Sequence, residues 1–276
     1  MSGAPDPLYV RARTALLDAA EALAEQLDAV VLVGAQAVYL HTSDADFVAT
    51  APYTTDADFC VAPADLNDTP LLSDLLTAQG FSPGEHPGAW LSPDRIPVDL
   101  MVPEALAGAG SRGAHLGSHG NRVARRAKGL EAALVDRKLT EITSLMPGVE
   151  RSVTMHVAGP AALLVSKVHK VAERIGAGDR ITDKDALDIM RLLQAIDTEA
   201  LAQGLVSLAA HKFTAEVTAE AMSQLTSLFG SPHEVGIRMA TRAARPSVGP
   251  DVIAASFAAL VSDLLAATDR LRVNRH

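Results

Sequence analysis

The stretch Val30–Val61, VVLVGAQAVYLHTSDADFVATAPYTTDADFCV, carries the features that decide the fold. Val30–Val33 is a short run of β-branched and apolar residues, which is the composition of a buried strand. Gly34 follows at once, and the residues after it favour a helix. A strand, a glycine and a helix N-terminus in this order allow a phosphate to approach the backbone closely and to meet unpaired N–H groups.

Acidic residues follow in a pattern that is typical of metal ligands. If Asp56–Val61 is a strand, its period of two places Asp56 and Asp58 on one face. A third acid, Asp99, interrupts the apolar run Arg95–Val102, which also predicts a strand. If the two strands are neighbours, the three carboxylates form a triad that suits Mg²⁺. Such a triad can hold two metal ions for phosphoryl transfer.

These residues resemble the signature of nucleotidyltransferases with the DNA polymerase β fold. In that family Gly-Gly or Gly-Ser precedes a short helix, an Asp-x-Asp pair follows, and a third acid lies on a later strand. The chain departs from this pattern in having Gly34-Ala35 and in a longer segment between Gly34 and Asp56.

A second acidic pair, Asp44 and Asp46, lies nearer to the family's usual spacing and remains an alternative pair of metal ligands. Asp56 and Asp58 are the preferred pair, because the strand-like Phe59–Val61 follows them. The segment around Asp44 is polar, which favours a loop.

Composition narrows the class of protein. The 276 residues are 48% hydrophobic, so they suffice for one large or two small domains with a substantial core. The formal charge of −9 argues against bulk, non-specific binding of nucleic acid. The single cysteine, Cys60, excludes an internal disulfide framework. With neither a signal sequence nor a membrane-spanning apolar run in the pattern, we expect a cytoplasmic protein that does not enter membranes.

The order of predicted elements indicates an α+β fold with two domains. Residues 1–150 are predicted to form a mixed nucleotidyltransferase-like domain, and residues 151–276 a helical domain. The predicted helices are 8–27, 71–78, 161–175, 198–208, 214–228 and 252–271, and a last strand is predicted at 153–157. No chemical motif is apparent after residue 195.

The segment between the third acid and the helical domain is unusual in two respects. Residues 105–121 are rich in Gly, Ser and His, and we interpret them as a mobile surface loop in preference to a metal site at His115 and His119. A basic cluster follows, made of Arg122, Arg125, Arg126, Lys128, Arg137 and Lys138. It is either a solvated face or a contact for a nucleotide triphosphate or an RNA backbone.

A second constellation lies in the helical domain. Lys167, Lys170 and Arg174 share one face of the predicted helix 161–175. The following segment, 182–189, has the pattern of a helix start with Thr182 or Asp183 as its N-cap. The two helices can form a hairpin that sets Lys167 opposite Asp188. This pair is either a structural ion pair or a phosphate-binding lysine held in place by the acid.

The motif Lys167, Arg174, Lys184-Asp185 and Asp188 is similar to that of the AbiEii or MenT type of nucleotidyltransferase toxins, which join a polymerase-β-like domain to a helical one. The resemblance covers roughly residues 30–195. It implies transfer of a nucleotide from an NTP to an acceptor, which can be the 3′ end of tRNA, and it implies an antitoxin protein as a partner.

The resemblance also implies roles for residues. Asp56 and Asp58 would bind Mg²⁺, and Asp99 would act as a base or a further metal ligand. Gly34 and Ala35 would admit the phosphates, and Lys167 would hold the triphosphate with Asp188 orienting it. Further contacts to the NTP are expected from the basic residues Lys170, Arg174 and Arg122. Two other interpretations stay open: a nucleotidyltransferase acting on a small molecule or a protein, and a catalytically silent relative that only binds a nucleotide or a partner.

Overall fold

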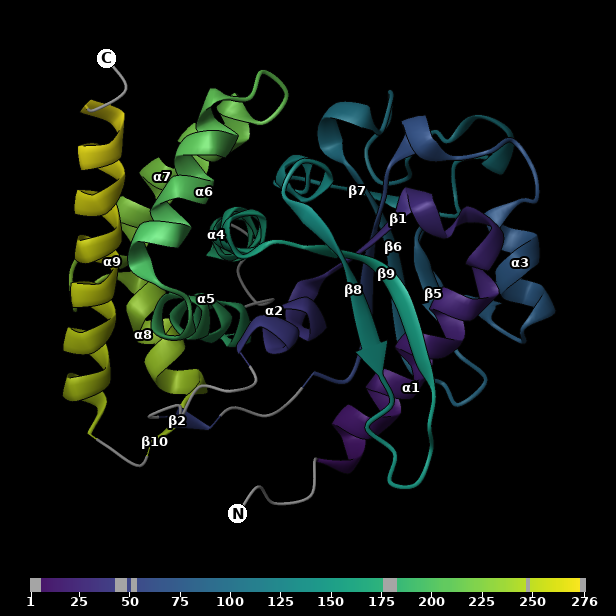
Figure 1. Cartoon of the computed structure of the whole chain (residues 1–276), viewed down its shortest axis with the longest axis horizontal. Coiled ribbons are helices and arrows are strands. Elements are labelled where there is room, and N and C mark those ends of the chain that lie inside the picture. The colour runs from purple at the N-terminus through teal and green to yellow at the C-terminus, as the bar shows by residue number, and fades with distance from the viewer. Residues whose placement is uncertain (1–5, 43–48, 51–53, 176–182, 247–248, 274–276) are drawn as a thin grey trace. The chain divides into compact units, whose positions relative to one another are not determined.

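The computed structural model describes residues 6–42, 49–50, 54–175, 183–246 and 249–273 (Figure 1). The chain divides into two compact units, of which the first contains residues 1–37 and 53–158 and the second contains residues 38–52 and 159–276. The first unit is built around a mixed sheet and the second is helical, so the protein has an α+β fold. The boundary lies after Ala158 and not after residue 150, because the strand that ends at Ala158 pairs within the sheet.

The described residues of the sheet unit form eight strands in one sheet. Seven of them follow the order β4-β5-β6-β3-β1-β9-β8, and β7 pairs with β6. The strands are β1 (Val30–Val33), β3 (Ala57–Val61), β4 (Ser82–Pro83), β5 (Ala89–Leu91), β6 (Pro97–Pro103), β7 (Arg125–Ala127), β8 (Arg137–Thr143) and β9 (Ser152–Ala158). The predicted strands at Val30–Val33, Asp56–Val61 and Arg95–Val102 are therefore confirmed within one or two residues.

Helices complete the sheet unit. The helix α1 (Pro7–Ala22) begins at Asp6, whose carboxylate accepts a hydrogen bond from the Leu8 N–H. It packs on β3, β6 and β9 (Figure 1). The helix α3 (Leu72–Ala78) follows the prediction closely. Short 3₁₀ turns are η1 (Ala24–Ala29), η2 (Pro63–Asp65), η3 (Glu104–Leu106), η4 (Gly117–His119) and η5 (Glu131–Leu134).

The helical unit is a bundle in which α9 runs along α6 and also contacts α5, α7 and α8 (Figure 1). Its helices are α4 (Pro160–Ile175), α5 (Lys184–Ala195), α6 (Thr198–Ala210), α7 (Ala215–Phe229), α8 (Val235–Ala243) and α9 (Pro250–Val273). A short antiparallel pair joins β2 (Ala49–Thr50) to β10 (Arg245–Pro246). The helix α2 (Gly34–Thr42) begins in the sheet unit, and its residues from Val38 on belong to the helical unit.

Three features of the fold differ from the sequence predictions. The predicted first helix ends at Ala22 and gives way to η1, while α8 and the strands β7 and β8 were not predicted. The strand β8 was missed because its residues, RKLTEIT, alternate poorly and are mostly solvent-accessible at an edge of the sheet.

Length and composition single out one helix that bears on the prediction of no membrane-spanning segment, a prediction that the structure does not test. The helix α9 is long and apolar enough to cross a membrane by these two criteria. Alanines contribute much of the apolar character of α9, and they do not form an unbroken run of large apolar residues. The sequence pattern therefore did not mark this helix as a possible membrane span. One side of α9 is buried in the bundle through Ile253, Phe257, Val261 and Leu264.

Candidate functional site

One edge of the sheet gathers the residues that the sequence singled out. The strand β3 runs antiparallel to β1 and parallel to β6. The C-terminal end of β1 therefore meets the N-terminal ends of β3 and β6. Gly34 and the first turn of α2 lie at this edge, together with Asp56, Asp58 and Asp99. Ala35 is buried in that first turn.

Two of the three acids are direct neighbours. In the pairing of β3 with β6, Asp58 is in register with Asp99. Residues in register on adjacent strands project to the same face, and adjacent strands lie about 4.8 Å apart. Asp56 precedes Asp58 by two residues, which places it on that face if the extended conformation continues. The prediction that the Asp99 strand lies beside the Asp56/Asp58 strand is confirmed.

Gly34 is held against the Asp58 side chain. Its φ of +70° is a conformation that L side chains rarely adopt. A Cβ at this position would overlap the Asp58 carboxylate. The close approach needs a residue without a side chain, so Gly34 is required both for its backbone angle and for the space that Asp58 occupies.

A buried glutamine anchors the segment that carries Asp56. Gln36 is 1% exposed, and its amide N–H₂ donates to the backbone carbonyls of Asp56 at 2.9 Å and Ala12 at 3.0 Å. Its amide oxygen accepts from Nε of Arg13 at 3.0 Å. The side chain of Asp56 is held as well, because the buried Thr54 hydroxyl donates a hydrogen bond to its carboxylate. The backbone of Asp56 is thus tied to both α1 and α2.

Asp99 already has a cationic partner. Nη2 of Arg125 lies 3.0 Å from Oδ2 of Asp99, and Nε of the same guanidinium lies 3.3 Å from it. Arg125 comes from β7, which pairs with the C-terminal half of β6. Both side chains are about one third exposed, at 34% and 31%. Binding of a metal ion by Asp99 would compete with this ion pair.

The carboxylates fit a hard cation by chemistry but are not gathered as a complete site. Mg²⁺ is commonly bound by one or two carboxylates together with substrate phosphates. Asp56 and Asp58 provide such ligands at the edge where Gly34 allows close approach. Among the residues that the structure describes, no three His, Cys, Asp or Glu side chains are placed to hold a metal ion. The alternative pair Asp44 and Asp46 lies outside the described residues.

The second constellation forms a buried charge cluster between α4 and α5. Nζ of Lys167 lies 2.6 Å from Oδ2 of Asp188 and 2.7 Å from Oδ1 of Asp185. The predicted pairing of Lys167 with Asp188 is therefore confirmed, and Asp185 is a second partner that the sequence did not assign to this lysine. Arg174 also pairs with Asp185.

Burial and charge act in opposite directions in this cluster. Burial alone disfavours the charged form of Lys167, but the carboxylates of Asp185 and Asp188 outweigh it and raise the lysine pKa above its usual range. Burial likewise opposes ionisation of Asp185, and Lys167, Lys170 and Arg174 together hold the pKa of that carboxyl below its usual range. Lys167 and Asp185 are therefore both charged in the folded protein at neutral pH.

The cationic side chains of the cluster differ in how far they are exposed to solvent. Lys167 is only 2% exposed, and two of its three N–H donors are taken by carboxylates. The side chain of Lys170 is 36% exposed and that of Arg174 is 26% exposed. A phosphate arriving from solvent therefore meets Lys170 and Arg174 before Lys167.

The predicted helix start at residues 182–183 is only partly described. Asp183 occupies the N-cap position of α5, but its carboxylate does not cap the helix. It accepts two hydrogen bonds from Arg242 of α8 instead, at 2.8 and 2.9 Å. Thr182 lies outside the described residues.

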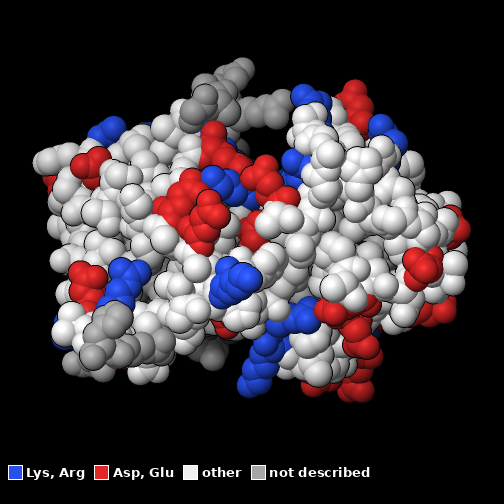
Figure 2. Space-filling view, turned by 90° about the horizontal axis from the view of Figure 1, so that it is seen from above, with Lys and Arg blue, Asp and Glu red and all other residues white. Residues whose placement is uncertain are grey.

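The basic cluster after residue 121 is largely neutralised. Arg125 pairs with Asp99, Arg126 lies 3.9 Å from Glu104, and Arg137 lies 3.0 Å from Asp65. Figure 2 shows the same mixture on the face that it displays, where Lys and Arg side chains stand singly or in small groups, mostly beside acidic ones. Arg122 is exposed and makes only a 3.4 Å contact to the carbonyl of Glu85.

The Gly-rich segment 105–121 lies mostly at the surface of the sheet unit, as predicted, and hydrogen bonds tie it to that unit at several points. His119 is buried, and Nδ1 accepts a hydrogen bond from the Leu72 N–H at the start of α3. With Nδ1 an acceptor, Nε2 carries the proton and donates to the carbonyl of Asn67 at 2.9 Å. His119 is thus a structural residue.

Several residues of these two regions were not found from the sequence. Gln36 acts through contacts between elements that are distant in the chain, and such contacts leave no local pattern. Thr54 bonds to Asp56, two residues on, and Arg125 was assigned only to the basic cluster and not to Asp99. Asp185 was visible in the motif, but its role as a partner of Lys167 depends on the geometry of the hairpin.

Comparisons with known proteins add no assignment. No protein-family model matches the chain, and a search of curated proteins returns no match.

Proposed function

We propose that the protein is a metal-dependent nucleotidyltransferase that transfers a nucleoside monophosphate from an NTP to an acceptor, with a sheet unit of the polymerase-β type. The observation that carries the proposal is the register of Asp58 with Asp99 beside the Gly34 turn. A phosphate-accessible helix start and paired carboxylates at one sheet edge are the components that phosphoryl transfer needs.

In this proposal Asp56 and Asp58 hold Mg²⁺, which neutralises charge on the triphosphate when bound. Gly34 admits the phosphates to the N-terminal N–H groups of α2. The Asp99 carboxylate accepts the proton of the attacking hydroxyl, and Arg125 keeps that carboxylate oriented. The acceptor oxygen forms a bond to the α-phosphorus as the bond to the leaving pyrophosphate breaks.

The finer assignment remains an inference from the sequence motifs. A tRNA 3′ end as the acceptor and a toxin role with an antitoxin partner rest on the resemblance to the AbiEii and MenT type. A cytoplasmic location rests on the single cysteine and on the sequence pattern, in which no signal sequence was found. The burial of Lys167 supports Lys170 and Arg174 as the residues of the helical unit that an incoming triphosphate can reach.

A second candidate is a catalytically silent relative that binds a nucleotide without turnover. The ion pair between Arg125 and Asp99 favours this candidate, because Arg125 already binds the carboxylate that would have to accept the proton. The two candidates differ in one observable, which is transfer of label from the NTP.

The experiment is label transfer with the full chain, Mg²⁺, each labelled NTP in turn and total tRNA. We expect label on RNA with the native protein and a loss of at least ~100-fold in Asp58→Asn and Asp56→Ala. Asp74→Asn is the matched control, because Asp74 is an exposed acid on α3, outside the proposed site.

Label on a protein or a small molecule, with RNA unlabelled, would identify the acceptor class without changing the chemistry. NTP binding with no transfer to any acceptor would contradict the enzymatic proposal in favour of the silent relative.

A further inference from the structure

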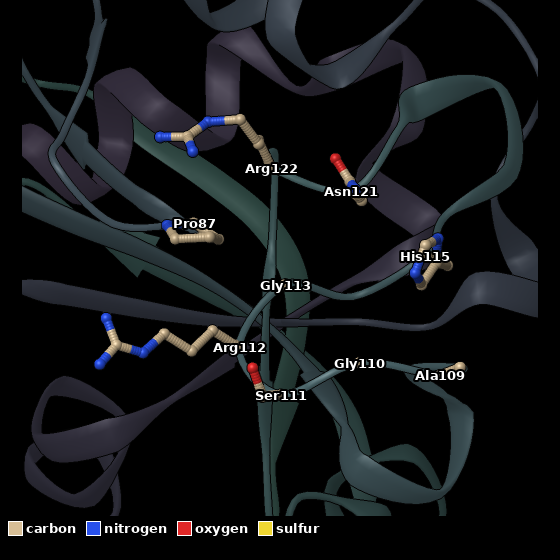
Figure 3. Close-up of a pocket in the computed structure, with 9 residues that line it drawn as sticks. All are labelled: Pro87, Ala109, Gly110, Ser111, Arg112, Gly113, His115, Asn121 and Arg122. Atoms are coloured by element: carbon tan, nitrogen blue, oxygen red, sulfur yellow. The ribbon is translucent and has the colours of Figure 1, made fainter.

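A pocket of about 380 Å³ in the sheet unit is lined by residues that the proposed chemistry does not use (Figure 3). Its lining residues are Pro87, Ala109, Gly110, Ser111, Arg112, Gly113, His115, Asn121 and Arg122. Within this described set there are two arginines and no acid, in a chain whose net charge is −9.

The two arginines flank the same part of the pocket. Figure 3 shows the side chains of Arg112 and Arg122 extending to one side of the chain at Gly113, with Pro87 between them. Arg112 is exposed, and in the described part of the chain its guanidinium has no hydrogen-bond or ion-pair partner. Arg122 has only the 3.4 Å contact to a backbone carbonyl. Both guanidiniums therefore have donors available for an external anion.

Hydrogen bonds hold the pocket in place. The N–H of Arg126 donates to the carbonyl of Arg112 at 3.0 Å, and the N–H of Ala114 donates to the carbonyl of Ala124 at 3.0 Å. On the other side, the N–H of Gly88 donates to the carbonyl of Arg122 at 2.9 Å. The backbones that carry the two arginines are thus fixed, which lowers the entropic cost of binding a ligand there.

The pocket is connected to the proposed base through β7. Gly113 pairs with Arg125, whose side chain binds Asp99. On its other side Arg125 is in register with Met101 of β6. The segment with Arg112 is therefore one strand further out than the strand that carries Arg125, on the side of β6 away from β3. An acceptor long enough to extend from Asp99 past Arg125 would reach this pocket.

We infer that the Arg112–Arg122 pocket binds backbone phosphates of a single-stranded RNA acceptor. Guanidinium pairs suit phosphate, since each offers a planar fork of donors. The described lining contains no Phe, Tyr or Trp ring, and the imidazole of His115 is its one ring on which a base could stack, so binding relies mainly on the backbone and tolerates different sequences. This inference rests on the proposed nucleotidyltransferase function, which it extends to the class of acceptor.

The test is RNA binding without turnover. A fluorescently labelled single-stranded RNA is titrated with the full chain in EDTA over a range of salt concentrations, and anisotropy is measured. In a variant combining Arg112→Ala and Arg122→Ala we expect at least ~10-fold weaker binding. The slope of log affinity against log salt should fall by ~1.4, because each phosphate contact to a single strand contributes about 0.7.

Arg11→Ala is the matched control, because Arg11 is an exposed arginine of the same unit whose guanidinium binds the carbonyl of Asp94. A variant combining Arg112→Lys and Arg122→Lys should recover part of the binding, since the charge remains. Far-UV circular dichroism and thermal unfolding check that each variant is folded.

The outcomes separate this inference from the proposed function. Equal RNA binding by the native protein and the double alanine variant, or no RNA binding by the native protein, overturns the inference. Weaker binding of a fluorescent NTP in that variant, with RNA binding unchanged, assigns the pocket to the nucleotide and also overturns it. Failure of label transfer with RNA binding intact contradicts only the proposed function.

Discussion

At the scale of single residues, the site at the sheet edge depends on a few positions whose contacts restrict what can replace them. Gly34 combines a left-handed backbone angle with direct contact to Asp58. The side-chain amide of Gln36 hydrogen-bonds to α1 and to the backbone of Asp56, and so fixes the two relative to each other. These residues perform no chemistry in the proposed reaction, yet they determine where the carboxylates lie.

Gly34→Ala is expected to disturb the site more than its backbone angle alone would predict. The new Cβ overlaps the Asp58 carboxylate, so we expect near-complete loss of transfer and a stability loss beyond the ~1–3 kcal/mol of left-handed strain. Gly148→Ala is the matched control, because Gly148 has a φ of +75° and nothing lies within 4 Å of the position that its Cβ would take. Urea denaturation and label transfer measure both effects. Equal losses in the two variants would show that the contact with Asp58 is unimportant.

At the scale of elements, the hairpin of α4 and α5 is organised by charge inside an apolar interface. Lys167, Asp185 and Asp188 are all buried, and their mutual pairing makes that burial tolerable. The same arrangement orients Lys170 and Arg174 toward Asp185 at the margin of the cluster. The motif therefore serves stability whether or not it also serves nucleotide binding.

The cluster makes stability depend on acid pH. The pKa of Asp185 is lowered in the folded state, so its contribution is present above about pH 4 and is lost as the pH falls further. Lys167→Met should cost ~3–5 kcal/mol at neutral pH, because it leaves buried carboxylates without their main partner. It should also reduce the loss of stability on acidification.

Urea unfolding at a series of pH values from about 3 to 7 measures this dependence. Lys212→Met is the control, because Lys212 is exposed at the end of α6 and is not part of the cluster. An unchanged acid dependence in Lys167→Met would mean that Asp185 is not held ionised by this lysine.

At the scale of the whole molecule, the chain combines a sheet unit that carries the acids with a helical unit that closes on its own core. The helix α9 contributes to that core, and the ring of Phe257 lies 5.2 Å from that of Phe229 between their centroids. Its apolar composition is thus used in the bundle, at least on the side that carries Ile253, Val261 and Leu264.

The packing of α9 predicts that the folded chain does not enter lipid bilayers. In vesicle flotation with neutral phospholipid we expect the full chain to stay in the aqueous fraction, since Ile253, Phe257, Val261 and Leu264 of α9 are already buried in the bundle. Phe257→Ala, which removes a fully buried ring at a cost of ~3–5 kcal/mol, should increase the fraction that floats. Flotation of the native chain would contradict this packing as the stable state of α9.

Local sequence patterns were enough to predict the strands β1, β3 and β6, the helices α3 and α4, and the order of a mixed unit before a helical one. These elements carry strong local periodicity or compact apolar runs, which depend on neighbours in the chain. The sequence also singled out Asp58, Asp99, Lys167 and Asp188 as candidate site residues, because charged residues within apolar patterns are conspicuous.

Which of these residues lie in contact could be seen only after the chain had folded. Three contacts join segments that are far apart in the chain. Asp58 is in register with Asp99, Arg125 forms an ion pair with Asp99, and Lys167 forms ion pairs with both Asp185 and Asp188. The same holds for the Gly-rich segment, whose hydrogen bonds to β7 and α3 give it a fixed place. Such contacts follow from strand pairing and helix packing, whose partners are selected by the burial of the whole core and are not encoded in any single stretch.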